Sequence, residues 1–159
     1  MKIKILIPVF NDWQSLSKLM NNIDNEIQNI ISHEISIIIV DDASTFDRQL
    51  ETENLSNINS IKILVMKENK GHARCIATGL KYILEKEEFD YVIPMDGDGE
   101  DRPEEIKEFI KTIENNPDKT VVGERVKRSE AFIFKLCYFF HKIITLVFTG
   151  HSIKFGNFT

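Results

Sequence analysis

Short apolar segments recur along the chain and predict the strands of a β-sheet. They consist mainly of Ile, Val and Leu with little polar alternation, which is typical of strands buried on both faces of a parallel sheet. The predicted strands are Ile3–Val9, Ile35–Val40, Ile61–Met66 and Tyr91–Met95, followed by a short fifth strand at Thr120–Gly123.

Between these segments, apolar residues recur at helical spacing, which predicts amphipathic helices. Asn11 or Asp12 is placed to cap the first helix, and Pro103 suits the first position of the third. The polar stretch Thr45–Ser60 is expected to be partly helical. The apolar stripes comprise Leu16, Leu19, Met20, Ile23, Ile27 and Ile30 in the first helix, Ile76, Ala77, Leu80, Ile83 and Leu84 in the second, and Ile106, Phe109, Ile110 and Ile113 in the third. This alternation predicts a doubly wound α/β domain, a mostly parallel sheet with helices on both faces.

The composition is ordinary for a soluble globular protein and limits its function. The chain has 159 residues, enough for one domain with a sizeable core. Its net charge of −5 argues against a general nucleic-acid binder, so no nucleic-acid partner is expected. Cys75 and Cys137 lie within apolar helical patterns without metal-ligand spacing, and Met1 leads almost directly into a strand. We therefore expect a reduced, cytoplasmic setting and no cleaved targeting segment.

The strongest chemical signal is an acidic loop that follows the strand at Tyr91–Met95. Asp96, Asp98, Glu100 and Asp101 place four carboxylates within six residues, with glycines between them. Glycines allow a tight turn and close approach to a ligand, and clustered carboxylate oxygens suit Mg²⁺ or Mn²⁺. An EF-hand is excluded, because the sixth and twelfth positions of the loop lack the required Gly and Glu. A solvated acidic turn is the remaining alternative.

Polar residues follow two other predicted strands at the equivalent place. Phe10, Asn11 and Asp12 come after the first strand, and Asp41 and Asp42 come after the second. In a parallel sheet these positions share the carboxyl edge with the acidic loop, and open α/β sheets bind ligands at that edge. Acids there can hydrogen-bond the base and ribose hydroxyls of a nucleotide, while a metal can neutralise a diphosphate. Helix capping is the alternative role for Asp12 and Asp42.

Five motifs in order along the chain carry a family resemblance. They are IPVFND, VDDAS, NKGHARCIATGL, MDGDGEDRPEE and VVGERVKR, and they extend from Ile3 to about Arg128. Together they resemble the family 2 glycosyltransferases of GT-A fold, especially the branch of dolichyl- or polyprenyl-phosphate sugar synthases. The resemblance implies a Rossmann-like nucleotide-sugar-binding core at residues 1–128. Residues 129–159 would continue the same domain with an apolar helix and the start of the acceptor side.

The resemblance also implies roles for individual residues. Asp96 and Asp98 correspond to the family's Asp-x-Asp motif and would bind Mg²⁺ or Mn²⁺. Arg125 and Arg128 would face the phosphates and, with Asp98, stabilise the leaving group. The nucleotide-sugar-binding positions would be Pro8, Phe10, Asp12, Asp41, Asp42, Gly71, Arg74, Asp96, Gly97 and Asp98. Phe10 and Asp12 stand where the family has Tyr and Glu, so hydroxyl contacts at Phe10 are lost.

The implied reaction transfers a sugar from a UDP- or GDP-type donor to a polyprenyl-phosphate or glycan acceptor. The acceptor would attack from the face opposite the leaving group, so the configuration at the anomeric carbon would invert. No residue is identified as the general base. A non-catalytic nucleotide- or partner-binding domain of the same fold stays open as an alternative. So does a sugar-nucleotidyltransferase, although that class would want a glycine- and arginine-rich loop after the first strand, where Pro8-Val9-Phe10-Asn11 has neither residue.

The segment Phe132–Phe148 is the most apolar part of the chain, with thirteen apolar residues in seventeen. It is short and is interrupted by Lys135, His141 and Lys142, so it is not expected to span a membrane. The segment has three interpretations: an interfacial helix at the inner face of the membrane, a helix packed against a part of the protein that this chain lacks, and a buried core helix. Gly150–Thr159 predicts a strand that enters the acceptor side, and we expect the chain to end before that side is complete.

Overall fold

The computed structural model describes residues 1–30, 32–48, 50, 55–117 and 119–123. The chain divides into two compact units, Met1–Asp118 and Lys119–Thr159, and every element named below belongs to the first. The predicted elements at Phe132–Phe148 and Gly150–Thr159 lie outside the described residues. The predicted strand at Thr120–Gly123 is wrong, because these residues have no strand conformation. A segment of this length becomes a strand only where a neighbouring strand accepts its hydrogen bonds.

Four parallel strands form the sheet: β1 (Lys2–Val9), β2 (Glu34–Asp41), β3 (Ser60–Val65) and β4 (Tyr91–Pro94). Their order is β3-β2-β1-β4, and Ile5 of β1 lies opposite Ile37 of β2 and Ile93 of β4. The predictions of these four strands are confirmed to within one residue at each end. Because β2, β1 and β4 are neighbours, the loops that follow them meet at one edge of the sheet.

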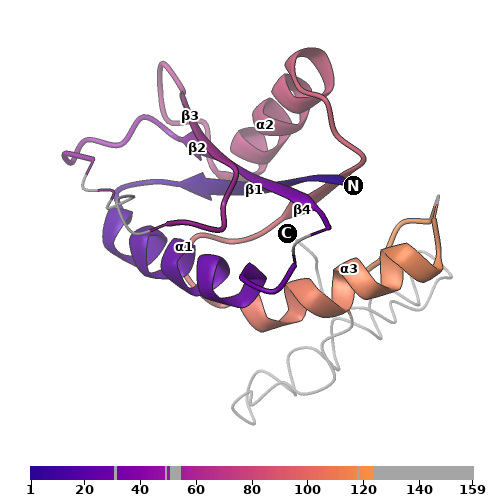
Figure 1. Cartoon of the computed structure of the whole chain (residues 1–159). Helices are drawn as coiled ribbons and strands as arrows, with labels where there is room; N and C mark the ends of the chain where they lie inside the picture. Colours follow the sequence, from indigo (N-terminus) through magenta and orange to yellow (C-terminus); the bar gives the residue numbers. More distant parts are fainter. Residues whose placement is uncertain (31, 49, 51–54, 118, 124–159) are drawn as a thin grey trace, which may run out of the picture. The chain divides into compact units, whose positions relative to one another are not determined.

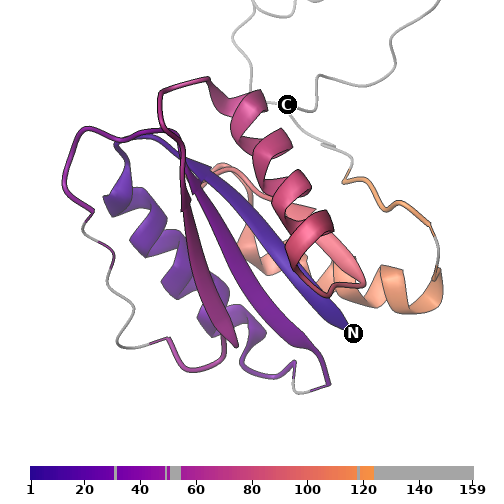
Figure 2. The same cartoon turned by 90° about the horizontal axis from the view of Figure 1, so that it is seen from above.

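Helices cover both faces of this sheet, as predicted (Figures 1 and 2). One face carries α1 (Trp13–Ile27) and α3 (Ile106–Asn115), the latter preceded by a short 3-10 helix, η1 (Pro103–Glu105). The other face carries α2 (His72–Lys86). Lys107 of α3 donates a hydrogen bond of 2.8 Å to Glu26 of α1, which joins the two helices at the surface.

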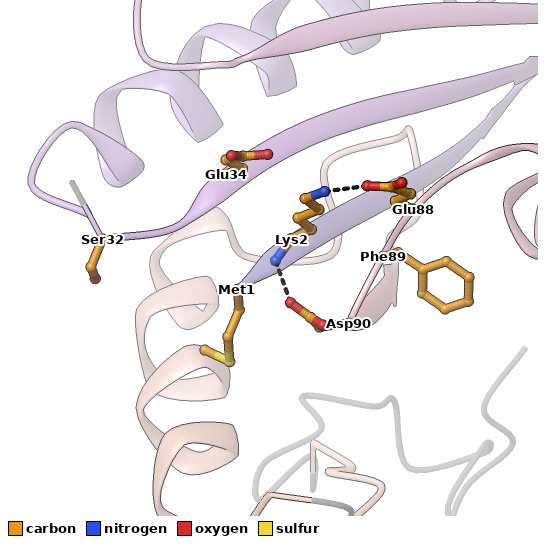
Figure 3. Close-up of a pocket in the computed structure, with 7 residues that line it drawn as sticks. All are labelled: Met1, Lys2, Ser32, Glu34, Glu88, Phe89 and Asp90. Atoms are coloured by element: carbon orange, nitrogen blue, oxygen red, sulfur yellow. Dashed lines mark hydrogen bonds and ion pairs between the residues drawn. The ribbon is translucent and has the colours of Figure 1, made fainter.

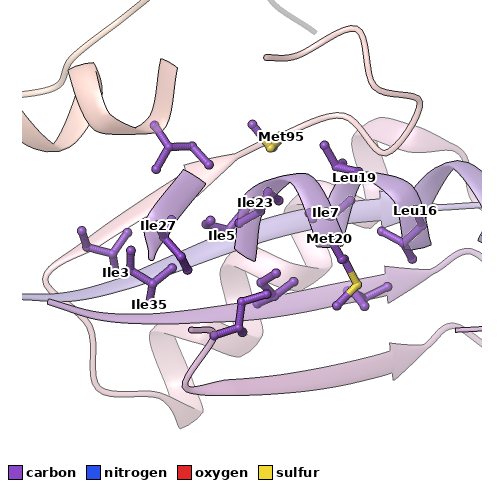
Figure 4. Close-up of a cluster of buried hydrophobic side chains, with 14 of the residues drawn as sticks. Ile3, Ile5, Ile7, Leu16, Leu19, Met20, Ile23, Ile27, Ile35 and Met95 are labelled. Atoms are coloured by element: carbon purple, nitrogen blue, oxygen red, sulfur yellow. The ribbon is translucent and has the colours of Figure 1, made fainter. Parts of the chain in front are cut away.

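The larger core lies between the sheet and α1 (Figure 4). Alternate residues of β1 and β2 point to this face because side chains alternate along a strand. The apolar stripe predicted for α1 is confirmed, with Ile30 partly buried just beyond the helix. The core residues drawn and labelled in Figure 4 are Ile3, Ile5, Ile7, Leu16, Leu19, Met20, Ile23, Ile27, Ile35 and Met95.

The apolar stripe predicted for α2 is largely wrong. Its fully buried residues are Cys75, Gly79 and Ile83, whereas Leu80 and Leu84 are 40% and 74% exposed. Gly79 explains the difference, because a Cβ at this position would lie 2.3 Å from Cδ1 of Leu6. The helix therefore approaches the sheet on its smallest residue, and not on its row of leucines.

The stretch Thr45–Ser60, predicted to be partly helical, has no helix among its described residues. Side chains satisfy its backbone instead. The buried carboxylate of Asp24 accepts hydrogen bonds from the backbone N–H groups of Asn57 (2.7 Å) and Ile58 (3.1 Å). A backbone that is paired in this way has no need of helical hydrogen bonds.

Candidate active site at the carboxyl edge of the sheet

The carboxyl ends of β1 and β2, the loops after β1, β2 and β4, and the start of α2 together carry every predicted site residue except two. Arg125 and Arg128 lie outside the described residues. The expectation that the acids after these three strands share one edge is therefore confirmed by the strand order. What each residue does at this edge differs from position to position.

Asp41 and Asp42 are the most deeply buried acids of the edge, at 0% and 2% exposure. Asp41 accepts a hydrogen bond from the Ser44 backbone (2.8 Å) and pairs with Arg48 (3.1 Å). Asp42 reaches across to the turn before α2, where its two oxygens accept the backbone N–H groups of Lys70 (2.7 Å) and Gly71 (2.8 Å). Asp42 therefore fastens a distant turn and does not cap a helix of its own.

The turn fastened by Asp42 leads directly into α2. Gly71 is the N-cap residue and has a φ of +84°, a conformation that favours glycine. Its carbonyl oxygen accepts the backbone N–H of Arg74 (3.0 Å), and the Arg74 side chain is exposed. The first turn of a helix presents unpaired N–H groups and a partial positive charge, which favours anions nearby. Gly71 and Arg74 thus lie where a phosphate group can be bound.

The acidic loop packs against the end of β1. A Cβ on Gly97 would lie 2.8 Å from the carbonyl oxygen of Pro8, so only glycine permits this close approach. The loop is also tied internally, since the Asp101 carboxylate accepts the Asp96 N–H (2.8 Å) and the Asp98 carboxylate accepts the Glu100 N–H (2.9 Å). Asp98 is exposed and Asp96 is partly buried.

His72, the first residue of α2, connects the acidic loop with this helix. Its Nε2 lies 3.4 Å from Oδ1 of Asp96. Sequence reasoning did not single out His72, although it stands within the motif NKGHARCIATGL. Its position directly after a glycine at a helix start was the available signal.

The loop after β1 contains Phe10, Asn11 and Asp12. Phe10 is 47% exposed, and Asp12 caps α1 through a hydrogen bond from the Ser15 N–H (3.2 Å). The capping interpretation of Asp12 is thus confirmed, while its nucleotide contact stays a prediction. Next to this loop is a groove of about 480 Å³, lined by Asn11, Trp13, Gln14, Thr45, Phe46 and Asp47.

Burial and the carboxylate of Asp42 raise the pKa of the Cys75 thiol to about 12, with burial as the larger cause. The thiol therefore stays protonated at neutral pH, and its sulfur lies 3.3 Å from that of Met66. Cys75 is a packing residue beneath the site and not a nucleophile.

Asp96 and Asp98 suit a divalent cation whose coordination is completed by a bound substrate. Among the described residues, no three His, Cys, Asp or Glu side chains converge as a metal cage. Mg²⁺ commonly needs no such cage of protein side chains, because it keeps several waters and binds one or two carboxylates together with substrate phosphates. The hard oxygens of these two residues match that requirement, and the start of α2 lies beside Asp96.

A second hollow lies at the opposite, amino edge of the sheet (Figure 3). It has a volume of about 430 Å³ and is lined by Met1, Lys2, Ser32, Glu34, Glu88, Phe89 and Asp90. Lys2 pairs with Glu88, and its backbone N–H donates to Asp90 (2.7 Å). No predicted site residue lines this hollow, and the contacts of Lys2 with Glu88 and Asp90 hold β1 to the segment before β4.

The part of the chain that the structure describes contains no helix with both the length and the apolar character required to cross a bilayer. The segment Phe132–Phe148, for which membrane contact was predicted, is not part of it.

Comparison with known proteins agrees with the fold and identifies the family. The chain is 28% identical over 127 residues to a dolichol-phosphate mannosyltransferase of Pyrococcus furiosus, and the match covers 80% of this chain and 34% of that protein. It is 29% identical over 136 residues to an undecaprenyl-phosphate 4-deoxy-4-formamido-L-arabinose transferase of Proteus mirabilis, which covers 84% of this chain and 40% of the relative. The chain therefore spans well under half the length of these two relatives.

Among solved structures, residues 1–349 of TarS from S. aureus match with a TM-score of 0.56 and 23% identity, over 81% of this chain and 39% of that fragment. This likeness confirms the predicted GT-A architecture. Residues 4–136 match the family described as glycosyl transferase family 2. The predicted resemblance is thus confirmed, and the chain belongs to glycosyl transferase family 2.

Proposed function

We propose that this protein binds a nucleoside diphosphate sugar at the carboxyl edge of the sheet and transfers the sugar to a polyprenyl-phosphate acceptor. The observation that carries the proposal is the position of the acidic loop between the end of β1 and the start of α2. Gly97 packs on the end of β1, and Asp96 faces His72 at the start of α2. Carboxylates and a helix N-terminus thus adjoin each other, which suits a cation bound together with a diphosphate.

The relatives support both halves of this reaction. The Pyrococcus and Proteus proteins are named for transfer to dolichol phosphate and undecaprenyl phosphate. TarS has been solved with UDP and with UDP-GlcNAc. We take UDP as the first donor nucleotide to test and GDP as the second. A phosphate acceptor is already anionic, so it needs little help from a general base.

Asp96 and Asp98 would hold Mg²⁺ or Mn²⁺, which when bound supplies positive charge that stabilises a leaving diphosphate. Arg74 would bind the phosphates from the start of α2, and Arg125 and Arg128 would add forked guanidinium contacts. The loops after β1 and β2 would hold the nucleoside. With the diphosphate fixed on this edge, the acceptor attacks from the opposite side of the sugar, and the configuration inverts.

Calorimetry with UDP, with and without Mn²⁺, tests the donor site. The parent is expected to bind UDP more tightly with Mn²⁺, and Asp98→Ala should remove the metal-dependent part while the protein stays folded. Glu108→Ala, which removes an exposed acid from α3, is the matched control and should bind like the parent. An unchanged metal-dependent affinity in Asp98→Ala would overturn the assignment.

Base preference and acceptor are tested separately. A carboxylate that reads the base prefers the ring N–H of uracil or guanine, so UDP or GDP should bind more tightly than ADP. Equal affinity for all three would exclude a carboxylate contact with a ring N–H of the base. A peripheral membrane contact through Phe132–Phe148, at the cytoplasmic face, predicts co-sedimentation with anionic vesicles that is lost in a Phe139→Ser, Phe140→Ser variant. A parent that stays in the supernatant would place this segment in the core.

A further inference from the structure

Asn11 makes an unusual set of contacts between two loops of the candidate site. Its side-chain oxygen accepts the backbone N–H groups of Thr45 (2.7 Å) and Phe46 (3.1 Å), and its side-chain nitrogen donates to Oγ1 of Thr45 (3.2 Å). Its own backbone N–H donates to Oγ of Ser44 (2.9 Å). We call Asn11, Ser44, Thr45 and Phe46 the Asn11 clasp. It ties the loop after β1 to the loop after β2.

The backbone of Asn11 has a φ of +58°, in the left-handed region. Asparagine is among the few residues other than glycine that adopt this region readily. The position therefore favours a residue that combines this φ with an amide side chain. Glycine would meet the first requirement only, and a β-branched or apolar residue would meet neither.

The clasp also shapes a binding surface. Asn11, Thr45 and Phe46 line the groove of about 480 Å³ beside the loop after β1. Phe46 is held through its backbone with its side chain 67% exposed, and Phe10, the neighbour of Asn11, is 47% exposed. Exposed rings whose backbones are fixed offer rigid contact area, which costs a ligand little conformational entropy to use.

We propose that Asn11 is a positioning residue for the nucleoside half of the donor, and that it acts by holding the loops after β1 and β2 at a fixed separation. This inference rests on the proposed function and deepens it. Without the clasp, a bound nucleotide would have to order both loops itself, so its affinity would fall. The effect belongs to the nucleoside end, because the clasp joins the loops after β1 and β2, which are the loops proposed to hold the nucleoside.

Two substitutions separate the effect of the Asn11 backbone conformation from the effect of its side-chain hydrogen bonds. Asn11→Gly keeps the left-handed φ and the backbone N–H but removes every side-chain hydrogen bond. Asn11→Asp keeps an oxygen that accepts the Thr45 and Phe46 N–H groups. The matched control is Asn59→Gly, because Asn59 fastens a loop at the other end of the sheet, where its side chain accepts the Ile35 N–H (2.7 Å).

The measurement is the dissociation constant of UDP, and of ADP, with Mn²⁺, at a temperature where thermal unfolding shows each variant of the 159-residue chain to be folded. Trp13, the single tryptophan of the chain, lines the same groove, so its fluorescence gives an independent titration signal. We expect Asn11→Gly to bind UDP about tenfold more weakly, to discriminate less between UDP and ADP, and to be rescued largely by Asn11→Asp. Asn59→Gly should lose stability but keep the affinity of the parent.

Three results would overturn the inference. An Asn11→Gly variant that binds UDP like the parent would make the clasp a purely structural contact. A weaker affinity with unchanged discrimination between UDP and ADP would place the effect at the diphosphate. A parent that binds neither UDP nor GDP would reject the proposed function itself, and the inference with it.

Discussion

Replacing Asp42 by alanine tests the link between the sheet edge and the start of α2. The variant loses both acceptors of the Lys70 and Gly71 N–H groups, which lie 2.7 and 2.8 Å from the carboxylate oxygens. The carboxylate is 2% exposed, so water does not compete for these bonds in the native protein. We expect a loss of stability that is large for a residue in a loop.

The magnitude follows from the two bonds. A hydrogen bond to a charged group contributes about 1.5–3 kcal/mol, so the pair sets an upper range of about 3–6 kcal/mol. Lys70 is exposed, and its freed N–H can turn to water, which favours the lower end. We therefore expect Asp42→Ala to lower the free energy of unfolding by about 3 kcal/mol. With a urea m-value of about 2 kcal/mol/M, the midpoint would fall by about 1.5 M.

Urea unfolding followed by circular dichroism measures this change, and Asp47→Ala is the control because Asp47 is an exposed acid in the same loop region. A second readout uses the thiol of Cys75, whose pKa the Asp42 carboxylate helps to raise. In a Cys137→Ser background, the pKa of Cys75 should be lower in Asp42→Ala than in the parent. If Asp42→Ala unfolds at the same urea concentration as Asp47→Ala, the two hydrogen bonds do not fasten the turn and the reasoning fails.

Three further substitutions test other parts of the structure. Gly79→Ala should lower stability by about 1 kcal/mol in urea unfolding, because the clash with Leu6 (about 1–3 kcal/mol) exceeds the gain in helix propensity (about 1 kcal/mol); a more stable variant would show that α2 is free to move. Gly97→Ala should displace the acidic loop from Pro8 and weaken Mn²⁺-dependent UDP binding, whereas equal binding would show that the loop tolerates the shift. Hydrogen bonds and charge from Lys62 and Lys4 lower the pKa of Glu87. The Glu87 carboxylate therefore stabilises the fold fully above the ordinary pKa of glutamate, and this stabilisation is lost as the pH falls through the lowered pKa. The urea midpoint of the parent should therefore fall more than that of Glu87→Gln between about pH 6 and about pH 3, and parallel curves would contradict this.

Most of the fold was predictable because the central strands are apolar on both faces. Such strands need helices above and below, and alternation along the chain then leaves few arrangements other than a parallel α/β sheet. The stripe of α1 was equally clear because its large apolar residues all belong to the larger core. The face of α2 was not predictable from apolar spacing, because Gly79 lies so near Leu6 that a side chain at this position would not fit. Glycine permits close packing because it has no side chain, and a pattern of apolar residues does not reveal a contact of this kind.

The position of the site was predictable, but the contacts that its residues make were less so. Strand ends in a parallel sheet share an edge, so the grouping of Asp41, Asp42 and Asp96 followed from topology alone. The partners of Asp42 lie 28 and 29 residues away, in a turn whose approach depends on the packing of α2. Contacts of that kind depend on three-dimensional geometry, and no local motif encodes them.

The contacts of Asp42 also change what base recognition would require. A carboxylate has about four acceptor positions, and the turn before α2 uses one on each oxygen. A base that hydrogen-bonds to Asp42 must therefore share these oxygens with the Lys70 and Gly71 N–H groups. The same turn starts α2, whose first residue faces Asp96 of the acidic loop. Binding of a base at Asp42 and of a metal at Asp96 would then both depend on the turn at Lys70 and Gly71. A substitution in this turn should therefore weaken the binding of the base and of the diphosphate together.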